Sequence, residues 1–149
     1  MADINLTQAE ADALIALEKH RVDEKVWNSP RLGTGISIPL TSSDRKENFM
    51  LDISRSQINL ARGKYQNRGR KVVVLVRLDF GGPPHRNPDG KDILCPHIHI
   101  YREDYADKWA YLLPPDIFTD INTPSKIYDD FIKYCNITLP PKMQRGLWE

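Results

Sequence analysis

The chain has 149 residues, of which 40% are hydrophobic and 28% charged, and its formal net charge is +1. These values are typical of a soluble globular domain and exclude a disordered or fibrous chain. No segment approaches a membrane-spanning length, and residues 1–20 have neither the basic start nor the apolar run of a secretion signal. We therefore expect one cytoplasmic domain over residues 1–149, with no membrane partner.

The first half of the chain predicts one helix followed by strands. Thr7 and Glu10 have the spacing of a capping box, and an apolar stripe follows them, so a helix is expected over residues 8–22. Beyond the proline and glycine of NSPRLGTG, apolar residues alternate over 36–40 and again over 49–53, as in strands that pack on one side. The segment SQINLARGKYQNRGR fits a strand, a turn or a strand pair.

The second half predicts a hairpin and a second helix. The β-branched run VVVLVRLDF reads as a central strand and ILCPHIHIY as its partner, so residues 71–101 are expected to form one long antiparallel hairpin. Residues 102–122 read as loop with a possible short element, Thr123 and Pro124 begin a helix, and LPPKMQRGLWE ends the chain as an extended tail. The order predicts an α+β fold with an antiparallel sheet of four to six strands and an N-terminal and a C-terminal helix packed on it.

Charge is distributed unevenly along the chain. No acidic residue lies between Asp52 and Asp79, whereas this segment, which we call the basic block, contains Arg55, Arg62, Lys64, Arg68, Arg70, Lys71 and Arg77. A following acidic region contains Glu103, Asp104, Asp107, Asp116, Asp120, Asp129 and Asp130. The basic block is expected to attract RNA or another polyanion, and the acidic region is a candidate surface for a protein partner.

A candidate site lies on the predicted hairpin. Side chains alternate along a strand, so His97 and His99 share one face while Ile98 and Ile100 share the other. The isoleucines are the expected core side, which places the histidines toward solvent or a cleft. The loop GGPPHRNPDG is long and has no apolar side chain apart from its prolines, and it could return His85 and Arg86 over the same end of the sheet.

These residues suggest metal-independent RNA cleavage by a toxin-like endoribonuclease without a cofactor. Histidine suits both proton transfers near neutral pH, and arginine can stabilise the charge that develops on phosphorus. The candidate catalytic residues are His97, His99, His85, Arg86 and Arg77. The candidate RNA-binding residues, with Tyr65 as a stacking surface, are Arg62, Lys64, Tyr65, Arg68, Arg70 and Lys71.

Three other interpretations stay open. Cys95, His97 and His99 are suitable zinc ligands, with His85 or Asp79 to complete the set, although no histidine follows His99 as a cupin-type site would require. The chain could instead be a non-enzymatic binding module or inhibitor that docks on protein or nucleic acid. The histidine pair could also be an ordinary surface pair, or a pair whose hydrogen bonds are satisfied within the protein.

Three motifs carry a resemblance to known sequences. GGPPHRNPDG, CPHIHIYRE and DKWAY, together with the capped opening helix, resemble a family of small uncharacterised prokaryotic proteins over nearly the whole chain. The resemblance implies a bacterial or mobile-element origin. It transfers no activity and no catalytic residue.

Overall fold

The computed structural model describes residues 5–57 and 62–144 and has an α+β architecture. The elements in chain order are α1 (Gln8–Ala16), β1 (Lys19–Arg21), β2 (Val26–Asn28), β3 (Gly35–Ser42), β4 (Asn48–Arg55), β5 (Gly63–Gly69), β6 (Val73–Phe80), β7 (His85–Arg86), β8 (Asp92–Ile93), β9 (His97–Ile100), β10 (Ala110–Leu112), α2 (Pro124–Tyr134), β11 (Ile137–Leu139) and β12 (Lys142–Gln144). None of the helices described is long and apolar enough to cross a membrane.

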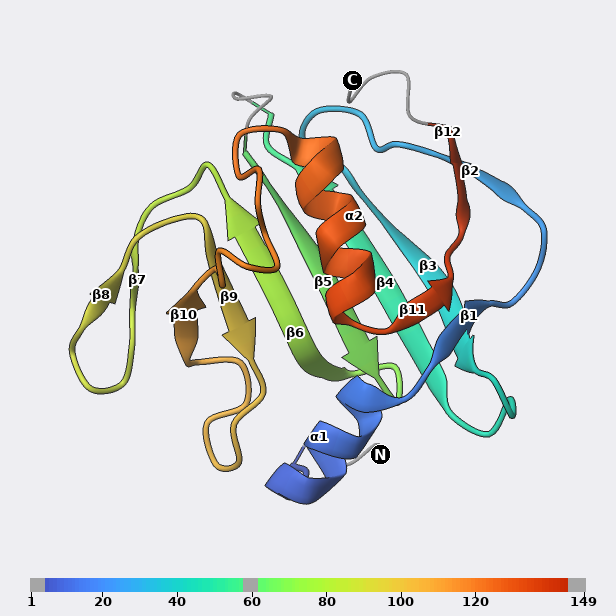
Figure 1. Cartoon of the computed structure of the whole chain (residues 1–149), viewed down its shortest axis with the longest axis horizontal. Coiled ribbons are helices and arrows are strands. Elements are labelled where there is room, and N and C mark those ends of the chain that lie inside the picture. Colours follow the sequence, from blue (N-terminus) through green and yellow to red (C-terminus); the bar gives the residue numbers. More distant parts are fainter. Residues whose placement is uncertain (1–4, 58–61, 145–149) are drawn as a thin grey trace.

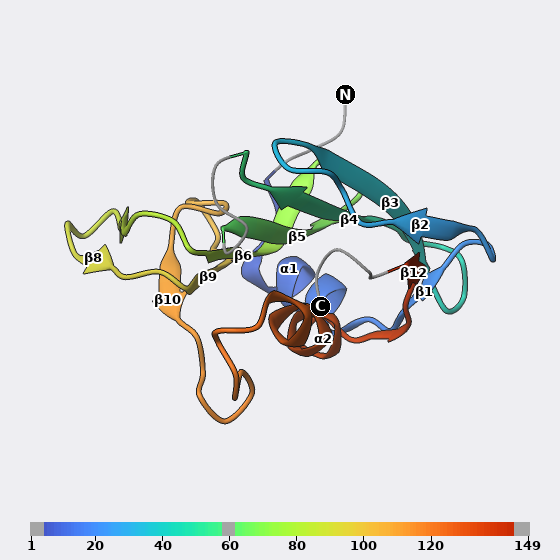
Figure 2. The same cartoon turned by 90° about the horizontal axis from the view of Figure 1, so that it is seen from above.

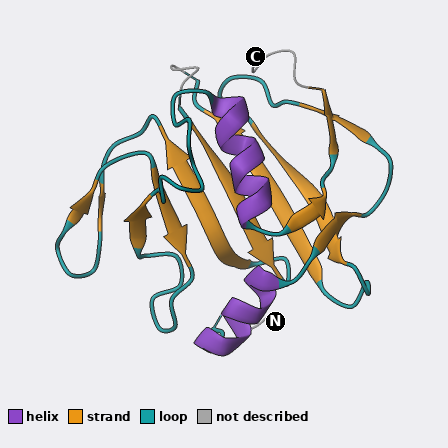
Figure 3. Ribbon diagram, in the orientation of Figure 1, coloured by secondary structure: helices purple, strands orange, loops and turns teal. Residues whose placement is uncertain are grey.

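Eight of the strands form one sheet in the order β10-β9-β6-β5-β4-β3-β1-β11. Neighbours pair antiparallel except β1 and β11, which are parallel. Both helices lie on the same side of this sheet, and the residues that the structure describes place no helix on its other side (Figures 1 and 2). Two further pairs, β2 with β12 and β7 with β8, lie at opposite ends of the molecule (Figure 3).

The core lies between the sheet and the two helices. Alternate residues of the central strands, such as Leu51, Tyr65 and Leu78, are fully buried there, and Tyr65 makes ring contacts with Tyr128 and Phe131 of α2. Because strand side chains alternate, the residues between them lie on the helix-free side. Two rows of polar side chains therefore cross that side in register: Ser37, Asp52, Gln66, Arg77 and His99 in one, and Ser54, Lys64, Asp79 and His97 in the other.

The capping box at the start of the first helix is confirmed. The Thr7 hydroxyl accepts from the Glu10 amide, and the Glu10 carboxylate accepts from the Thr7 amide, each at 3.1 Å. The expected end of this helix at residue 22 is wrong, because α1 stops at Ala16. Residues 19–21 instead form β1, which pairs with β3 and β11. The Lys19 side chain donates a hydrogen bond to the Ile15 carbonyl near the end of α1 and so caps the helix there.

The expected sheet of four to six strands is too small. The strands that the prediction missed, β1, β10 and β11, each have three residues, which is too short for an alternating pattern to stand out. The parallel pair β1–β11 also joins segments at opposite ends of the sequence, and no local signal marks such a pairing. The expected extended tail, residues 139–149, begins at the last residue of β11 and forms β12, while its residues 145–149 lie outside the described part of the chain.

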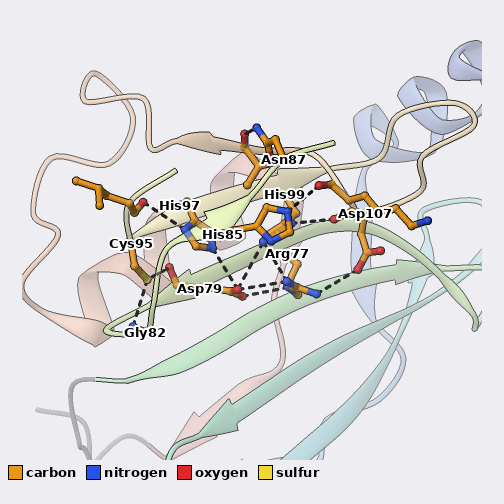
Figure 4. A network of polar contacts seen from close by, with 12 residues as sticks. Arg77, Asp79, Gly82, His85, Asn87, Cys95, His97, His99 and Asp107 are labelled. Atoms are coloured by element: carbon orange, nitrogen blue, oxygen red, sulfur yellow. Dashed lines mark hydrogen bonds and ion pairs between the residues drawn. The ribbon is translucent and has the colours of Figure 1, made fainter. Parts of the chain in front are cut away.

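The expected hairpin of residues 71–101 is present as β6 and β9, which pair antiparallel from Val76–Ile100 to Asp79–His97. The connection between them has structure of its own. Residues 85–86 and 92–93 pair as the small hairpin β7–β8, and Gly90 adopts a φ of 86° in the tight turn that joins them. This connection folds over the histidines of β9 (Figure 4).

Candidate functional site

The end of the β6–β9 ladder brings together the histidines and charged residues of the two polar rows. Arg77 and Asp79 of β6 lie directly opposite His99 and His97 of β9. Arg77 and Asp79 share a face because they lie two residues apart on one strand, but the register that joins them to the histidines depends on the fold. All four side chains converge in one polar network (Figure 4).

His97 lies between a backbone carbonyl and a carboxylate. Its Nδ1 is 3.2 Å from the Leu94 carbonyl oxygen, and its Nε2 is 3.3 Å from Asp79 Oδ2. A carbonyl can only accept, so Nδ1 carries a hydrogen and Nε2 faces the carboxylate. Because a lone pair cannot face a carboxylate favourably, a proton or another cation is needed between Nε2 and Asp79.

His99 has a different set of partners. Its Nδ1 is 2.8 Å from the Asp107 carbonyl oxygen, and its Nε2 is 3.0 Å from Nη2 of Arg77. The same reasoning puts the hydrogen on Nδ1, so Nε2 accepts a hydrogen bond from the guanidinium. A neutral His99 is therefore fully paired, and it helps to hold Arg77, which also bonds Asp79 and the Asp107 carboxylate.

Asp79 is the electrostatic centre of the network. Burial alone would raise the pKa of its carboxyl, but its polar contacts with His97 and His99 and the charge of Arg77 together outweigh burial and hold the pKa well below its ordinary value. Asp79 is therefore a stable anion at neutral pH. Its Oδ2 oxygen lies beside Nε2 of His97 and helps to fix the orientation of that ring.

The histidines of β9 are less exposed than the sequence suggested. Of the two expected positions, solvent or a cleft, the solvent position is wrong, because His97 and His99 are each 1% exposed, and His97 lines a cleft. The isoleucine side of the strand also faces the core, as expected, and Ile98 is buried. Both faces are covered because residues 81–96 fold back over the histidine side, which a single-strand pattern cannot predict.

His85, on β7, is the histidine of this cluster that reaches solvent. Its Nε2 bonds the Lys108 carbonyl oxygen at 2.7 Å, and its ring lies 4.6 Å from that of His99 and 6.0 Å from that of His97, between centroids. Nε2 therefore carries the hydrogen, which leaves the lone pair on Nδ1 available. The predicted return of His85 over the sheet is confirmed, and Asn87 anchors the same segment through two hydrogen bonds to Ala110.

Arg86 does not join this cluster. It is exposed, and its guanidinium pairs with Asp92 across the β7–β8 hairpin at 2.9 Å. Successive residues of a strand point to opposite sides, so the return of His85 toward the histidines turns Arg86 away from them. The expectation that both residues reach the site is therefore correct for His85 alone.

A cleft of about 150 Å³ opens onto this network. Asp79, His85 and His97 contribute to its lining, together with Arg62 and Lys64 from the basic block. Arg62 and Lys64 also border an adjoining polar cavity of about 400 Å³ beside Arg55. Both side chains are exposed and have no acidic partner among residues 5–57 and 62–144, so their charges are available to an anion in the cleft.

Two other arginines of the basic block form ion pairs within the protein. Arg68 forms a two-pronged ion pair with Asp52 at 2.6 and 2.8 Å, and Arg70 pairs with Glu47 and Glu10. Lys71 is exposed in the turn after β5. Burial tends to raise the pKa of Asp52, but its hydrogen bonds with Arg68, Ser37 and Gln66 and the charge of Arg68 together outweigh burial and lower it. The block is therefore not one uniform cationic surface.

The expected stacking role of Tyr65 is wrong. Its side chain is fully buried on the helix side, and its hydroxyl donates to the Pro124 carbonyl. The acidic region is likewise partly used inside the protein, since Asp107 bonds Arg77, Glu103 accepts from the Gln8 amide, and Asp130 is buried. Neighbouring residues of a strand point to opposite faces, so Tyr65 cannot share the face of Lys64 once residues 63–69 are known to form a strand.

Cys95 lies beside the network with its sulfur engaged elsewhere. Its thiol donates to the Asp79 carbonyl and accepts from the Gly82 amide, at 3.2 and 3.3 Å. Burial raises the pKa of this thiol. A compact set of possible metal ligands within the described residues comprises Asp79, His97 and His99, and Cys95 is not part of it.

A family model matches residues 6–137 of the chain, and its description is a family of unknown function, DUF6978. This match confirms the resemblance to an uncharacterised family. No curated protein and no solved structure matches the chain.

Proposed function

The chain belongs to DUF6978, a family of unknown function, and we propose from its own residues that it is a metal-independent endoribonuclease of the toxin-like kind. The observation that carries this proposal is the cleft, which combines two histidines in different hydrogen-bonding states with two cations that have no acidic partner in the described part of the chain. One histidine offers a lone pair and the other a proton. RNA cleavage through its own 2′-hydroxyl needs this combination.

In the proposed reaction His85 is the general base. Its Nδ1 takes the proton of the 2′-hydroxyl, and the 2′-oxygen attacks the adjacent phosphorus. His97 is the general acid, because its Nε2 proton passes to the 5′-oxygen as the bond between phosphorus and that oxygen breaks. The products are a 2′,3′-cyclic phosphate and a free 5′-hydroxyl, and the separation of 6.0 Å between the two rings allows both to reach one phosphate.

The charged residues around the histidines have supporting roles in this proposal. Arg62 and Lys64 would bind the phosphate and stabilise the negative charge that grows on it in the transition state. Asp79 Oδ2 lies 3.3 Å from His97 Nε2 and orients that ring. His99 and Arg77 are positioning residues, because His99 holds the guanidinium that in turn holds Asp79.

The chemistry of the products tests the proposal. Purified protein should cleave single-stranded RNA to fragments with 2′,3′-cyclic phosphate and 5′-hydroxyl ends, and cleavage should persist in excess EDTA. A substrate with 2′-deoxyribose at the cleavage position should remain intact, because it lacks the nucleophile. Cleavage of the deoxy substrate, or its dependence on an added metal, would contradict the proposed mechanism.

Salt dependence tests the proposed RNA contact at Lys64. Neutralising a phosphate of a single strand releases about 0.7 counterion, so Lys64→Gln should lower the slope of log affinity against log salt concentration by about 0.7. Arg70→Gln is the matched control, since Arg70 already pairs with Glu47 and Glu10 and should leave the slope unchanged. Both slopes can be measured by fluorescence anisotropy with a labelled RNA.

The second candidate, a non-enzymatic RNA-binding module, is separated by the same two experiments. Binding that weakens steeply with salt but never yields cyclic phosphate would favour it. Binding that is absent or insensitive to salt would remove the basis for both candidates, because each depends on the cations at the cleft.

A further inference from the structure

Three potential ligand atoms converge beneath the cleft. His97 Nε2 and His99 Nε2 lie 3.3 and 3.5 Å from the same oxygen, Oδ2 of Asp79. All three atoms lie within 4.8 Å of one another. A tetrahedral zinc ion with bonds of about 2.0–2.1 Å separates neighbouring ligands by about 3.3–3.4 Å, so the spacing around Asp79 is that of a zinc site.

The hydrogen bonds of the two imidazoles also fit metal binding. Each Nδ1 points at a backbone carbonyl, of Leu94 for His97 and of Asp107 for His99. This is the arrangement that orients a metal-ligating histidine and fixes its lone pair on Nε2. Both histidines are 1% exposed, so the surrounding chain already holds them in this orientation.

We propose that Asp79, His97 and His99 bind a divalent cation of the zinc class, and that this cation inhibits the protein. Two nitrogens and one oxygen suit zinc and its neighbours, whereas Mg²⁺ prefers a shell of oxygens. The inhibition, unlike the binding, rests on the proposed function. A metal on His97 Nε2 occupies the position from which the proton is donated.

Arg77 competes with a metal ion for the ligand atoms of this site. Its Nη2 is 3.0 Å from His99 Nε2 and 3.3 Å from Asp79 Oδ2, so the guanidinium already supplies a positive charge at this place. A metal ion must displace it. Removing the guanidinium should therefore strengthen zinc binding, an effect that a merely structural arginine would not produce.

Zinc binding should be measured first without RNA, by titration against a chromophoric chelator. Wild-type protein is expected to bind one zinc ion. Asp79→Asn and His97→Gln should each weaken binding by at least about tenfold to a hundredfold, the range that loss of even an outer-shell partner produces. Arg77→Gln should tighten it, and circular dichroism would establish that each variant is folded.

Matched controls come from the same chain. His20 lies on β1, far along the sheet from this cluster, so His20→Ala should bind zinc as the wild type does. Cys95→Ser should also bind normally, because the sulfur is bonded to backbone groups. Equal loss in the His20 variant, loss in the Cys95 variant, or no stoichiometric binding by the wild type would overturn the site.

The effect on cleavage is a separate measurement. Stoichiometric zinc should inhibit RNA cleavage, EDTA should restore it, and equal Mg²⁺ should have no effect. Zinc that binds without inhibiting would overturn the inhibitory role. If no cleavage occurs under any condition, the proposed function and the inhibition both fail. The zinc titration still shows whether Asp79, His97 and His99 bind the metal.

Discussion

Replacing Lys19 by methionine is expected to lower the free energy of unfolding by about 2–5 kcal/mol, because it leaves buried carbonyl groups without donors. The Lys19 side chain is 0% exposed, and its ammonium donates to the carbonyls of Ile15, Leu17 and Cys135 at 2.7–2.8 Å. These carbonyls lie at the ends of α1 and α2. One side chain therefore caps both helices.

The charge of Lys19 fits this task. Burial lowers its pKa to about 8, so the ammonium group is still protonated in most molecules at neutral pH. The ammonium also lies 4.9 Å from the ring centroid of Phe49. Methionine can fill a similar volume and contact the ring, but it offers no hydrogen-bond donor.

Lys133→Met is the matched control, since Lys133 is exposed in the last turn of α2. Thermal melting should place Lys19→Met roughly 4–20 °C below the wild type and Lys133→Met close to it. Equal melting temperatures for the two variants would show that the carbonyls find other donors. Lys19 would then not be the cap of the two helices.

The sequence pattern predicts the long elements of the fold well, because each has a local signal. The capping box and alternating residues of β3, β4 and β6 are local patterns, and Pro124 begins α2 as expected. The end of α1 and the strand β1 are different. They depend on Lys19 reaching Cys135, more than a hundred residues away, and no window of the sequence contains that contact.

The candidate site was predictable in its residue types but not in its arrangement. Alternation placed His97 and His99 on one face correctly, yet their burial depends on how residues 81–96 fold over them. Truncating either histidine should consequently cost stability, contrary to the expectation for an exposed strand. The sequence indicates Asp79 as a possible zinc ligand but not as the partner of His97, because the register that sets the two opposite each other is a property of the folded sheet.

His85 is consequently the residue that gives the clearest test of catalysis, since its side chain is partly exposed and its removal opens no core cavity. His85→Ala is expected to reduce RNA cleavage by roughly a hundredfold to ten-thousandfold, the usual contribution of a positioned proton-transfer group. RNA affinity should stay near that of the wild type, because Arg62 and Lys64 remain in place. Cleavage rates and binding can be measured on the same labelled RNA.

Arg86→Ala is the control for this variant, because it alters the next residue of the same short strand on the side that faces away from the cleft. It should cleave RNA at nearly the wild-type rate. Added imidazole should partly restore cleavage by His85→Ala if the missing group is a base, whereas it cannot repair a displaced loop. Equal losses in the two variants, with no rescue by imidazole, would mean that β7 supports the fold of the cleft and that the base must be sought elsewhere.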